Sequence, residues 1–228
     1  MAGLPSSRAS DAARVRVWDL PTRLCHWAIL ACVVGSFVTI NLGGNWVAWH
    51  FRFGYALLAL VVFRVLWGFA GSRWARFSSF PPSPRRALGY LRGRSPSTPG
   101  HNPLGALSVY ALLAALAVQV GTGLFANDAI MWDGPLRSLV SGATSDWLTR
   151  VHKTNRFVLV GLIALHVAAI AYYALVRRER LTAAMVGGDK TDIDPSQGVE
   201  DGTALRLRAL LVAAISVAAV WAMLRLAG

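Results

Sequence analysis

Long apolar stretches alternate with short polar ones along most of this chain. Five stretches are long enough to cross a bilayer as helices, because a hydrocarbon core of about 30 Å needs about 20 apolar residues. They lie at about residues 24–42, 46–69, 104–126, 151–176 and 205–226. The second contains Arg64, and the fourth contains Lys153 and Arg156. The pattern predicts an all-α integral membrane protein.

Polar segments separate the predicted spans. SSFPPSPRR and GRSPSTPGHNP contain proline, serine and glycine, which break helices. GGDKTDIDPSQGVEDG is polar and acidic, which is typical of a loop or mobile linker. The predicted parts are a cytoplasmic N-terminal tail (1–17), a four-helix domain (18–188), a polar linker (189–204) and a fifth transmembrane helix (205–228).

The first span follows a basic stretch and therefore resembles a secretory signal peptide. NLGGNW after it lacks a small-x-small cleavage site, and four more spans follow, so we interpret the first span as retained. The opening MAGLPSSRASDAARVRV contains arginine and serine, as transit peptides do. We favour a short cytoplasmic tail over that alternative.

Composition agrees with a membrane protein. Hydrophobic residues make up 55% and charged residues 15% of the 228 positions, with a mean hydropathy of +0.47. Soluble domains carry about 25% charged residues. The formal net charge of +12 would suggest nucleic acid on a soluble protein, so the distribution of that charge has to be considered.

The basic residues gather in alternate connections. Three groups are rich in them: Arg8, Arg14, Arg16 and Arg23; Arg73, Arg76, Arg85, Arg86, Arg92 and Arg94; and Arg177, Arg178, Arg180, Lys190, Arg206 and Arg208. Cytoplasmic connections carry such an excess. We therefore predict a cytoplasmic N-terminus and an external C-terminus. The charge then reports topology, and nucleic acid is not required.

Four histidines lie within the predicted spans, where ionisable residues are costly and mark function. His26 is near the cytoplasmic start of the first span, and His50 is near the outer start of the second. His152 and His166 share the fourth span. Their separation of fourteen residues puts both rings on one helix face, about 21 Å apart. That distance suits two separate sites, one in each leaflet.

One pairing of the four histidines respects these depths. His152 cannot share a site with His166, and pairing His26 with His152 or His50 with His166 would join opposite leaflets. The remaining pairs are His50 with His152 on the outer side and His26 with His166 on the inner side. Both pairs are predicted to bind metal.

Haem iron fits these pairs better than other metals. Imidazole suits zinc, copper, iron and nickel, but two histidines without a cysteine or carboxylate make a poor structural zinc site. The interior of an apolar helix bundle is a usual place for a porphyrin. Gly54 and Gly161, near the histidines, are small enough to leave room for a flat macrocycle.

Cationic residues near the histidines are candidates to bind haem propionates. Arg64 lies fourteen residues after His50 and so reaches the inner level on the same helix face, as a partner of a propionate or of quinone. Its alternative is a cation that extends to the membrane surface. Arg52, Lys153 and Arg156 lie near the outer level.

Two further groups of polar and aromatic residues are given interfacial positions. His101 is interpreted as an interfacial loop residue, with a part in an inner quinone or propionate site as the alternative. Tryptophans at the span ends are interpreted as an aromatic belt. They are Trp18, Trp27, Trp46, Trp49, Trp67, Trp74 and Trp147.

Four segments resemble the bacterial cytochrome b561 family, in the branch that is similar to b-type cytochrome subunits of nickel–iron hydrogenases. They are VWDLPTRLCHW, WHFRFGY with VVFRVLWGF, GHNPLG with VQVGTGLF, and VHKTNRFVLVGLIALH, and together they span roughly residues 15–188. The resemblance implies a four-helix transmembrane bundle with two b-type haems bound by His26, His50, His152 and His166. The fifth helix departs from that pattern, and we interpret it as peripheral or as a partner-docking element.

Three functions are compared. We favour transmembrane electron transfer through two haem b groups between a periplasmic carrier, such as cytochrome c, and the quinone pool. The second is a stand-alone quinone oxidoreductase that oxidises a small periplasmic reductant such as superoxide, so whether the chain is itself an enzyme stays open. The third, a non-redox transporter, is disfavoured because three spans offer few polar residues for a midplane path. A homodimer is also left open.

The predicted outer loop between the third and fourth spans is the candidate docking surface. Its sequence, ANDAIMWDGPLRSLVSGATSDWL, contains Asp128, Asp133 and Asp146. These carboxylates are available for a basic redox partner or for substrate. The alternative is a solvated loop without such a role.

Overall fold

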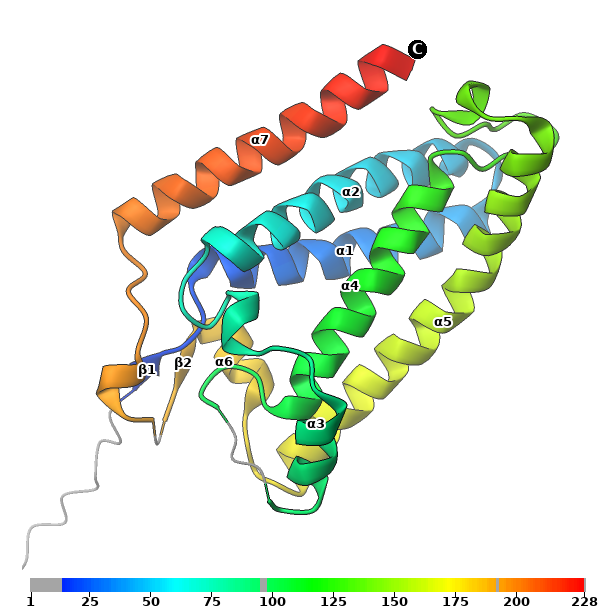
Figure 1. Ribbon diagram of the computed structural model, residues 1–228. Coiled ribbons are helices and arrows are strands. Elements are labelled where there is room, and N and C mark those ends of the chain that lie inside the picture. Colours follow the sequence, from blue (N-terminus) through cyan, green and yellow to red (C-terminus); the bar gives the residue numbers. More distant parts are fainter. Residues whose placement is uncertain (1–13, 95–97, 192, 228) are drawn as a thin grey trace, which may run out of the picture.

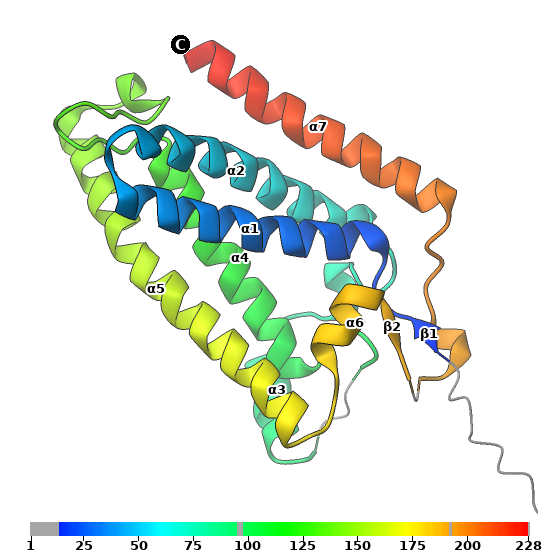
Figure 2. The ribbon, with the colours of Figure 1, turned by 180° about the vertical axis from the view of Figure 1, so that it is seen from behind.

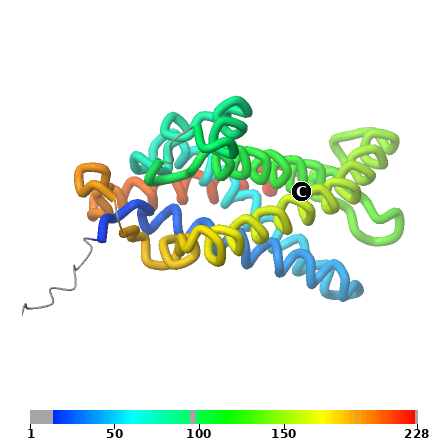
Figure 3. Tube along the Cα trace, turned by 90° about the horizontal axis from the view of Figure 1, so that it is seen from below, coloured from blue at the N-terminus to red at the C-terminus, as the bar shows by residue number. Residues whose placement is uncertain are grey.

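Five long helices form an elongated bundle, in which the two drawn in green to yellow lie at an angle to the other three (Figures 1 and 3). The computed structural model describes residues 14–94, 98–191 and 193–227. The long helices are α1 (Leu20–Leu42), α2 (Val47–Ala70), α4 (Pro103–Gly123), α5 (Gly142–Leu175) and α7 (Thr203–Ala227). In that part of the chain, five helices are long and apolar enough to cross a membrane. The predicted all-α integral membrane fold is confirmed. Most of the predicted tail, residues 1–13, lies outside the described residues.

Two helical hairpins and one outer helix make up the bundle. α1 packs on α2 and α4 packs on α5, while α2 and α4 join the two hairpins. The tight α1–α2 turn uses Gly43 and Gly44 at φ 67° and 53°, followed by the short helix η1 (Gly44–Trp46). α7 lies against α2 on the side away from α5 (Figures 1 and 2).

The two ends of the bundle differ. At one end, which we call the sheet end, β1 (Val15–Arg16) pairs antiparallel with β2 (Asp189–Lys190). The same end holds η2 (Phe77–Ser79), α3 (Pro84–Leu91), α6 (Leu181–Gly187) and η4 (Pro195–Gln197). At the other end, which we call the loop end, residues 124–141 connect α4 to α5 and include η3 (Arg137–Leu139).

α5 begins nine residues before the predicted fourth span. Ser141 caps its first turn by accepting a hydrogen bond from the Thr144 backbone. Ser145 Oγ then donates to the Phe125 carbonyl at 2.7 Å, and Thr149 Oγ1 accepts from the Asn127 amide at 3.0 Å. The polar first turns therefore continue the helix and hold the loop end, which hydropathy alone does not reveal.

The described parts of the predicted tail (14–17) and of the predicted linker (189–191 and 193–204) form an anchor for α7. The Asp201 side chain is only 6% exposed and forms two ion pairs. Its Oδ2 lies 3.1 Å from Arg16 Nη1, and its Oδ1 lies 3.3 Å from Arg206 Nε. It also accepts the Leu20 backbone N–H at 3.2 Å. One carboxylate thus connects β1, the first residue of α1 and the first turns of α7.

Three tryptophans predicted to belong to an interfacial belt lie inside the protein. Trp18, Trp67 and Trp74 are buried. Trp67 Nε1 donates to Thr22 Oγ1 at 3.1 Å, and Trp74 Nε1 donates to a backbone carbonyl at 2.8 Å. The indole N–H groups of Trp67 and Trp74 therefore have protein partners, which is what a buried tryptophan requires. The belt interpretation is wrong for these residues, whereas Trp27, Trp46, Trp49 and Trp147 are exposed.

The close contact between α2 and η2 predicts a stability defect. A Cβ on Gly68 would lie 2.1 Å from the Phe77 ring. Gly68→Ala should therefore lower the free energy of unfolding by about 1–3 kcal/mol through overpacking. Gly161→Ala is the matched control, because a Cβ there meets no atom within 4 Å. Denaturant unfolding in detergent measures both, and equal stability of the two variants would contradict the described packing.

Candidate functional site

Two pairs of histidine rings meet in the bundle interior, one pair near each end. His26 of α1 faces His166 of α5 near the sheet end, with ring centres 6.4 Å apart. His50 of α2 faces His152 of α5 near the loop end, with ring centres 6.3 Å apart. The structure brings together the same partners that the sequence paired.

The ring separations fit a metal held between two imidazoles. A metal–imidazole bond is about 2 Å long and the nitrogen lies about 1 Å from the ring centre, so a metal between opposed nitrogens separates the centres by about 6 Å. No group of three or more histidine, cysteine or carboxylate side chains suited to a metal occurs in the described parts of the chain. Two axial imidazoles with the other ligands supplied by a macrocycle match this donor set.

Helix packing leaves width for a flat group at both levels. α1 and α2 pack closely on each other, but α5 makes few or no close backbone contacts with either of them. The histidine rings nevertheless reach across. Gly54 lies one turn from His50, and a Cβ on it would meet no atom within 4 Å. Gly161 is exposed and a Cβ on it would likewise meet no atom within 4 Å, so its place beside a bound group stays a prediction.

The loop-end rings are held through one nitrogen each. His50 Nδ1 lies 3.0 Å from the Ser36 carbonyl, and His152 Nδ1 lies 2.9 Å from the Gln119 carbonyl. A carbonyl oxygen only accepts, so each Nδ1 carries the proton and each Nε2 keeps its lone pair. This tautomer presents Nε2 for coordination, as is usual for metal-binding histidines.

Gln119 and Asn155, which are not among the predicted site residues, support His152. The Gln119 amide nitrogen lies 3.1 Å from His152 Nε2, and Asn155 Nδ2 donates to Gln119 Oε1 at 2.8 Å. A metal on Nε2 would take the place of the first contact, so the Gln119 side chain has to turn away when a metal binds. Their signal was available, because uncharged amides inside apolar spans need hydrogen-bond partners.

Arg64 lies inside the bundle near the sheet end. It is 8% exposed, and its Nη1 has no hydrogen-bond partner among the described residues. The guanidinium carbon lies 5.1 Å from the centre of the Phe77 ring. Arg64 is therefore a buried cation and does not extend to the membrane surface.

His101 lies close to that cation. The centre of its ring lies 4.7 Å from that of Trp18 and 4.3 Å from that of Phe80. Its Nδ1 is buried without a hydrogen-bond partner in the described segments. Burial, followed by the positive charge of Arg64, lowers the pKa of His101 to about 3. The ring is therefore neutral at physiological pH and belongs to an aromatic cluster.

The predicted outer propionate partners lie on the surface. Arg52 and Arg156 are exposed, and each guanidinium lies 4.6 Å from a neighbouring ring centre, that of Trp49 or Phe157 respectively. Lys153 is also exposed. Contact of these cations with a bound group stays a prediction.

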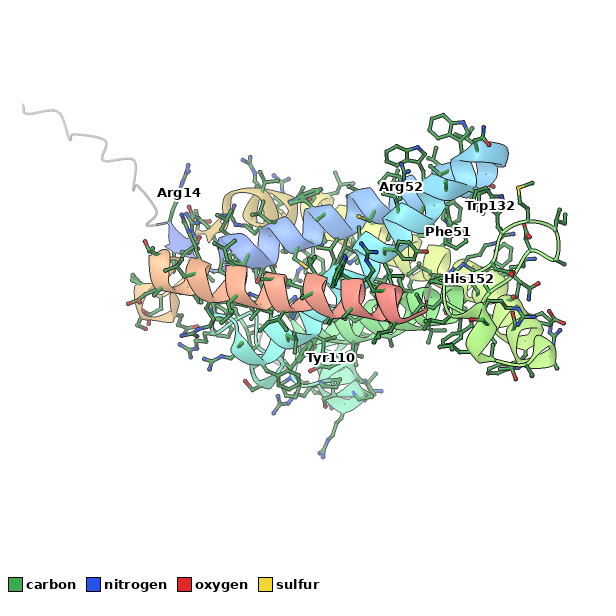
Figure 4. All side chains as sticks on the ribbon, turned by 90° about the horizontal axis from the view of Figure 1, so that it is seen from above. Arg14, Phe51, Arg52, Tyr110, Trp132 and His152 are labelled. Atoms are coloured by element: carbon green, nitrogen blue, oxygen red, sulfur yellow. The ribbon has the colours of Figure 1, made fainter. Side chains whose placement is uncertain are left out.

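The loop end uses two of its carboxylates for its own structure. Asp128 accepts from the backbone amides of three residues, 130–132, at 2.8–2.9 Å, and these bonds lower its pKa. Asp146 accepts from Asn127 Nδ2 at 3.0 Å. Trp132 packs 6.0 Å from Phe51, on the same side as His152 and far from Arg14 (Figure 4). The loop is thus fastened onto α2 and α5.

The fold defines a multi-pass membrane protein, and the two stacked histidine pairs are its candidate haem sites. The chain belongs to the prokaryotic cytochrome b561 family, whose model matches residues 17–188. The suspected family is confirmed. Its function is transmembrane electron transfer, and the family's b-type haem is the cofactor.

Three curated relatives carry the same description, "Probable Ni/Fe-hydrogenase B-type cytochrome subunit". The protein from Azotobacter chroococcum mcd 1 is 28% identical over 214 residues, which cover 76% of this chain and 87% of the relative. The one from Azotobacter vinelandii is 27% identical over the same coverage. The Bradyrhizobium diazoefficiens protein is 22% identical, covering 80% and 88%. No solved structure matches significantly.

Separate substitutions at the two levels should have separate effects. His152→Ala should remove haem from the loop-end pair only, and His26→Ala from the sheet-end pair only, because the pairs share no side chain. Haem per polypeptide, measured in each purified variant, should fall to about half of the wild-type value. Full haem content in either variant would contradict the pairing.

The buried neutral His101 predicts a contribution to acid sensitivity. Its folded pKa of about 3 is below the unfolded value, so the stability it contributes is present above about pH 6.5 and lost as the pH falls toward 3. The loss is at most about 1.4 kcal/mol per pH unit. His101→Phe keeps the aromatic packing and should unfold at lower pH than wild type. Superimposable acid-unfolding curves would contradict this role.

Proposed function

We propose that this protein carries electrons across a bacterial inner membrane through two haem b groups. His26 and His166 hold one group, and His50 and His152 hold the other. The observation that supports this most is the repeated ring separation of 6.3–6.4 Å at two levels of the bundle. Each haem supplies a centre that takes up and releases one electron.

The chain's own side chains would fix and shield the two centres. The Ser36 and Gln119 carbonyls orient the loop-end imidazoles. Arg64 would bind a propionate near the sheet end, and Arg52 and Arg156 would do so near the loop end. Apolar residues of α2, α4 and α5, which include Leu57, Leu116 and Leu159, keep water out of the bundle between the levels.

The proposed orientation puts the sheet end in the cytoplasm. Basic residues that the positive-inside rule assigns to the cytoplasm gather at the sheet end, and these include Arg16, Arg85 and Arg177. The loop end then meets a periplasmic redox protein such as a cytochrome c. Quinone dissolved in the membrane is the other electron carrier. The relatives' description as hydrogenase cytochrome subunits supports a protein redox partner.

Purified full-length protein tests the proposal directly. It should contain two haems per polypeptide and show a b-type reduced-minus-oxidised visible spectrum. In proteoliposomes with the loop end facing outward, electrons from an external reductant should reduce an acceptor enclosed in the vesicles. A colourless preparation made with ample haem would overturn the proposal. Quinone reduction by a small reductant without any partner protein would favour the stand-alone oxidoreductase.

A further inference from the structure

The surroundings of the two histidine pairs differ in their hydrogen bonds. Both loop-end rings donate from Nδ1 to a backbone carbonyl, at 3.0 Å and 2.9 Å. For His26 and His166, no ring hydrogen bond occurs within the described ranges. A donated Nδ1 proton makes an imidazole a more basic ligand, which stabilises the oxidised state of a bound iron. The loop-end pair therefore favours the oxidised form more than the sheet-end pair does.

The charges near the two pairs differ in the same sense. Arg64 is 8% exposed, and no carboxylate oxygen lies within 4.0 Å of its guanidinium in the part of the chain that the structure describes. A buried charge acts at low dielectric and is poorly screened. The cations near the loop-end pair, Arg52, Lys153 and Arg156, lie instead on the outside of the bundle, where they are exposed. A nearby positive charge stabilises an added electron.

Other ionisable groups at the sheet end largely support this difference. The pKa of His101 is lowered to about 3 mainly by burial and further by the positive charges of Arg64 and Lys190. Lys190 is partly buried and donates to the Pro99 carbonyl at 2.8 Å. The buried carboxylate of Asp19 opposes the effect, but it accepts hydrogen bonds from Thr22 N at 2.7 Å and from Trp67 and Ser72, which disperse its charge.

We propose that Arg64 is a tuning residue that makes the sheet-end pair the stronger electron acceptor, so that an electron passes from the loop-end centre to the sheet-end centre. The step would balance as a one-electron transfer: the group held by His50 and His152 would be oxidised and the group held by His26 and His166 reduced. The proposal rests on the two-haem function above. Arg64 acts through its charge whether or not it also contacts a propionate.

Spectroelectrochemical titration of the purified holoprotein tests this order. Wild type should show two one-electron transitions, and His152→Ala, which removes the loop-end centre, should retain the one of higher potential. Arg64→Met should lower the midpoint potential of that transition by at least about 59 mV. For a one-electron couple this is a tenfold fall in the reduced-to-oxidised ratio at a given potential. Arg64→Lys should restore most of the shift, because it keeps the charge.

Arg73→Met is the matched control. Arg73 is also at the sheet end, but it is exposed and lies 4.7 Å from the Trp74 ring centre. Its loss should leave both transitions in place. An unmoved upper transition in Arg64→Met would overturn the tuning role.

The assignment does not depend on the arginine variants folding. If His152→Ala retains the lower transition, or if His26→Ala retains the upper one, the proposed order is wrong although two haems are bound. A protein that binds no haem would instead overturn the proposed function itself. The two failures are therefore distinguishable.

Discussion

The spacing of two histidines on one straight helix determines most of this architecture. α5 presents His152 and His166 on one face, and each ring faces an opposing ring at its own level. α1 supplies His26 from its first turns, and α2 supplies His50 from its first turn. Because α1 and α2 form an antiparallel hairpin, these two rings lie at opposite ends of the bundle. α4 then fills the remaining side and contributes the carbonyl that orients His152.

The anchors at the two ends hold this arrangement in register. At the loop end, Ser145 and Thr149 fasten the connecting chain onto the first turns of α5. At the sheet end, the buried Asp19 binds Trp67 of α2 and the backbone of α1. A hydrogen bond inside a protein is modest in net energy but costly to leave unmade. These polar contacts therefore resist sliding of one helix along another, which apolar packing alone tolerates.

The fold and the histidine pairing could be predicted from the sequence because hydropathy and helical periodicity are local properties. The pairing of His26 with His166 needed only depth and helix direction. The support of His152 by Gln119 and the burial of Trp67 could not be predicted in this way, because they depend on which helix faces meet. The β1–β2 pairing joins Val15 to Lys190, and no local pattern in two such distant segments indicates that they meet.

The contact of Asp201 with Arg16 and with the Leu20 amide has a consequence for biogenesis. The first residues of α1 emerge from the ribosome early, yet their partners are synthesised about 180 residues later. Until then α1 can insert, but its first turn lacks its final contacts. The end of the bundle that is made first is thus completed last, after the linker to the fifth helix has left the ribosome.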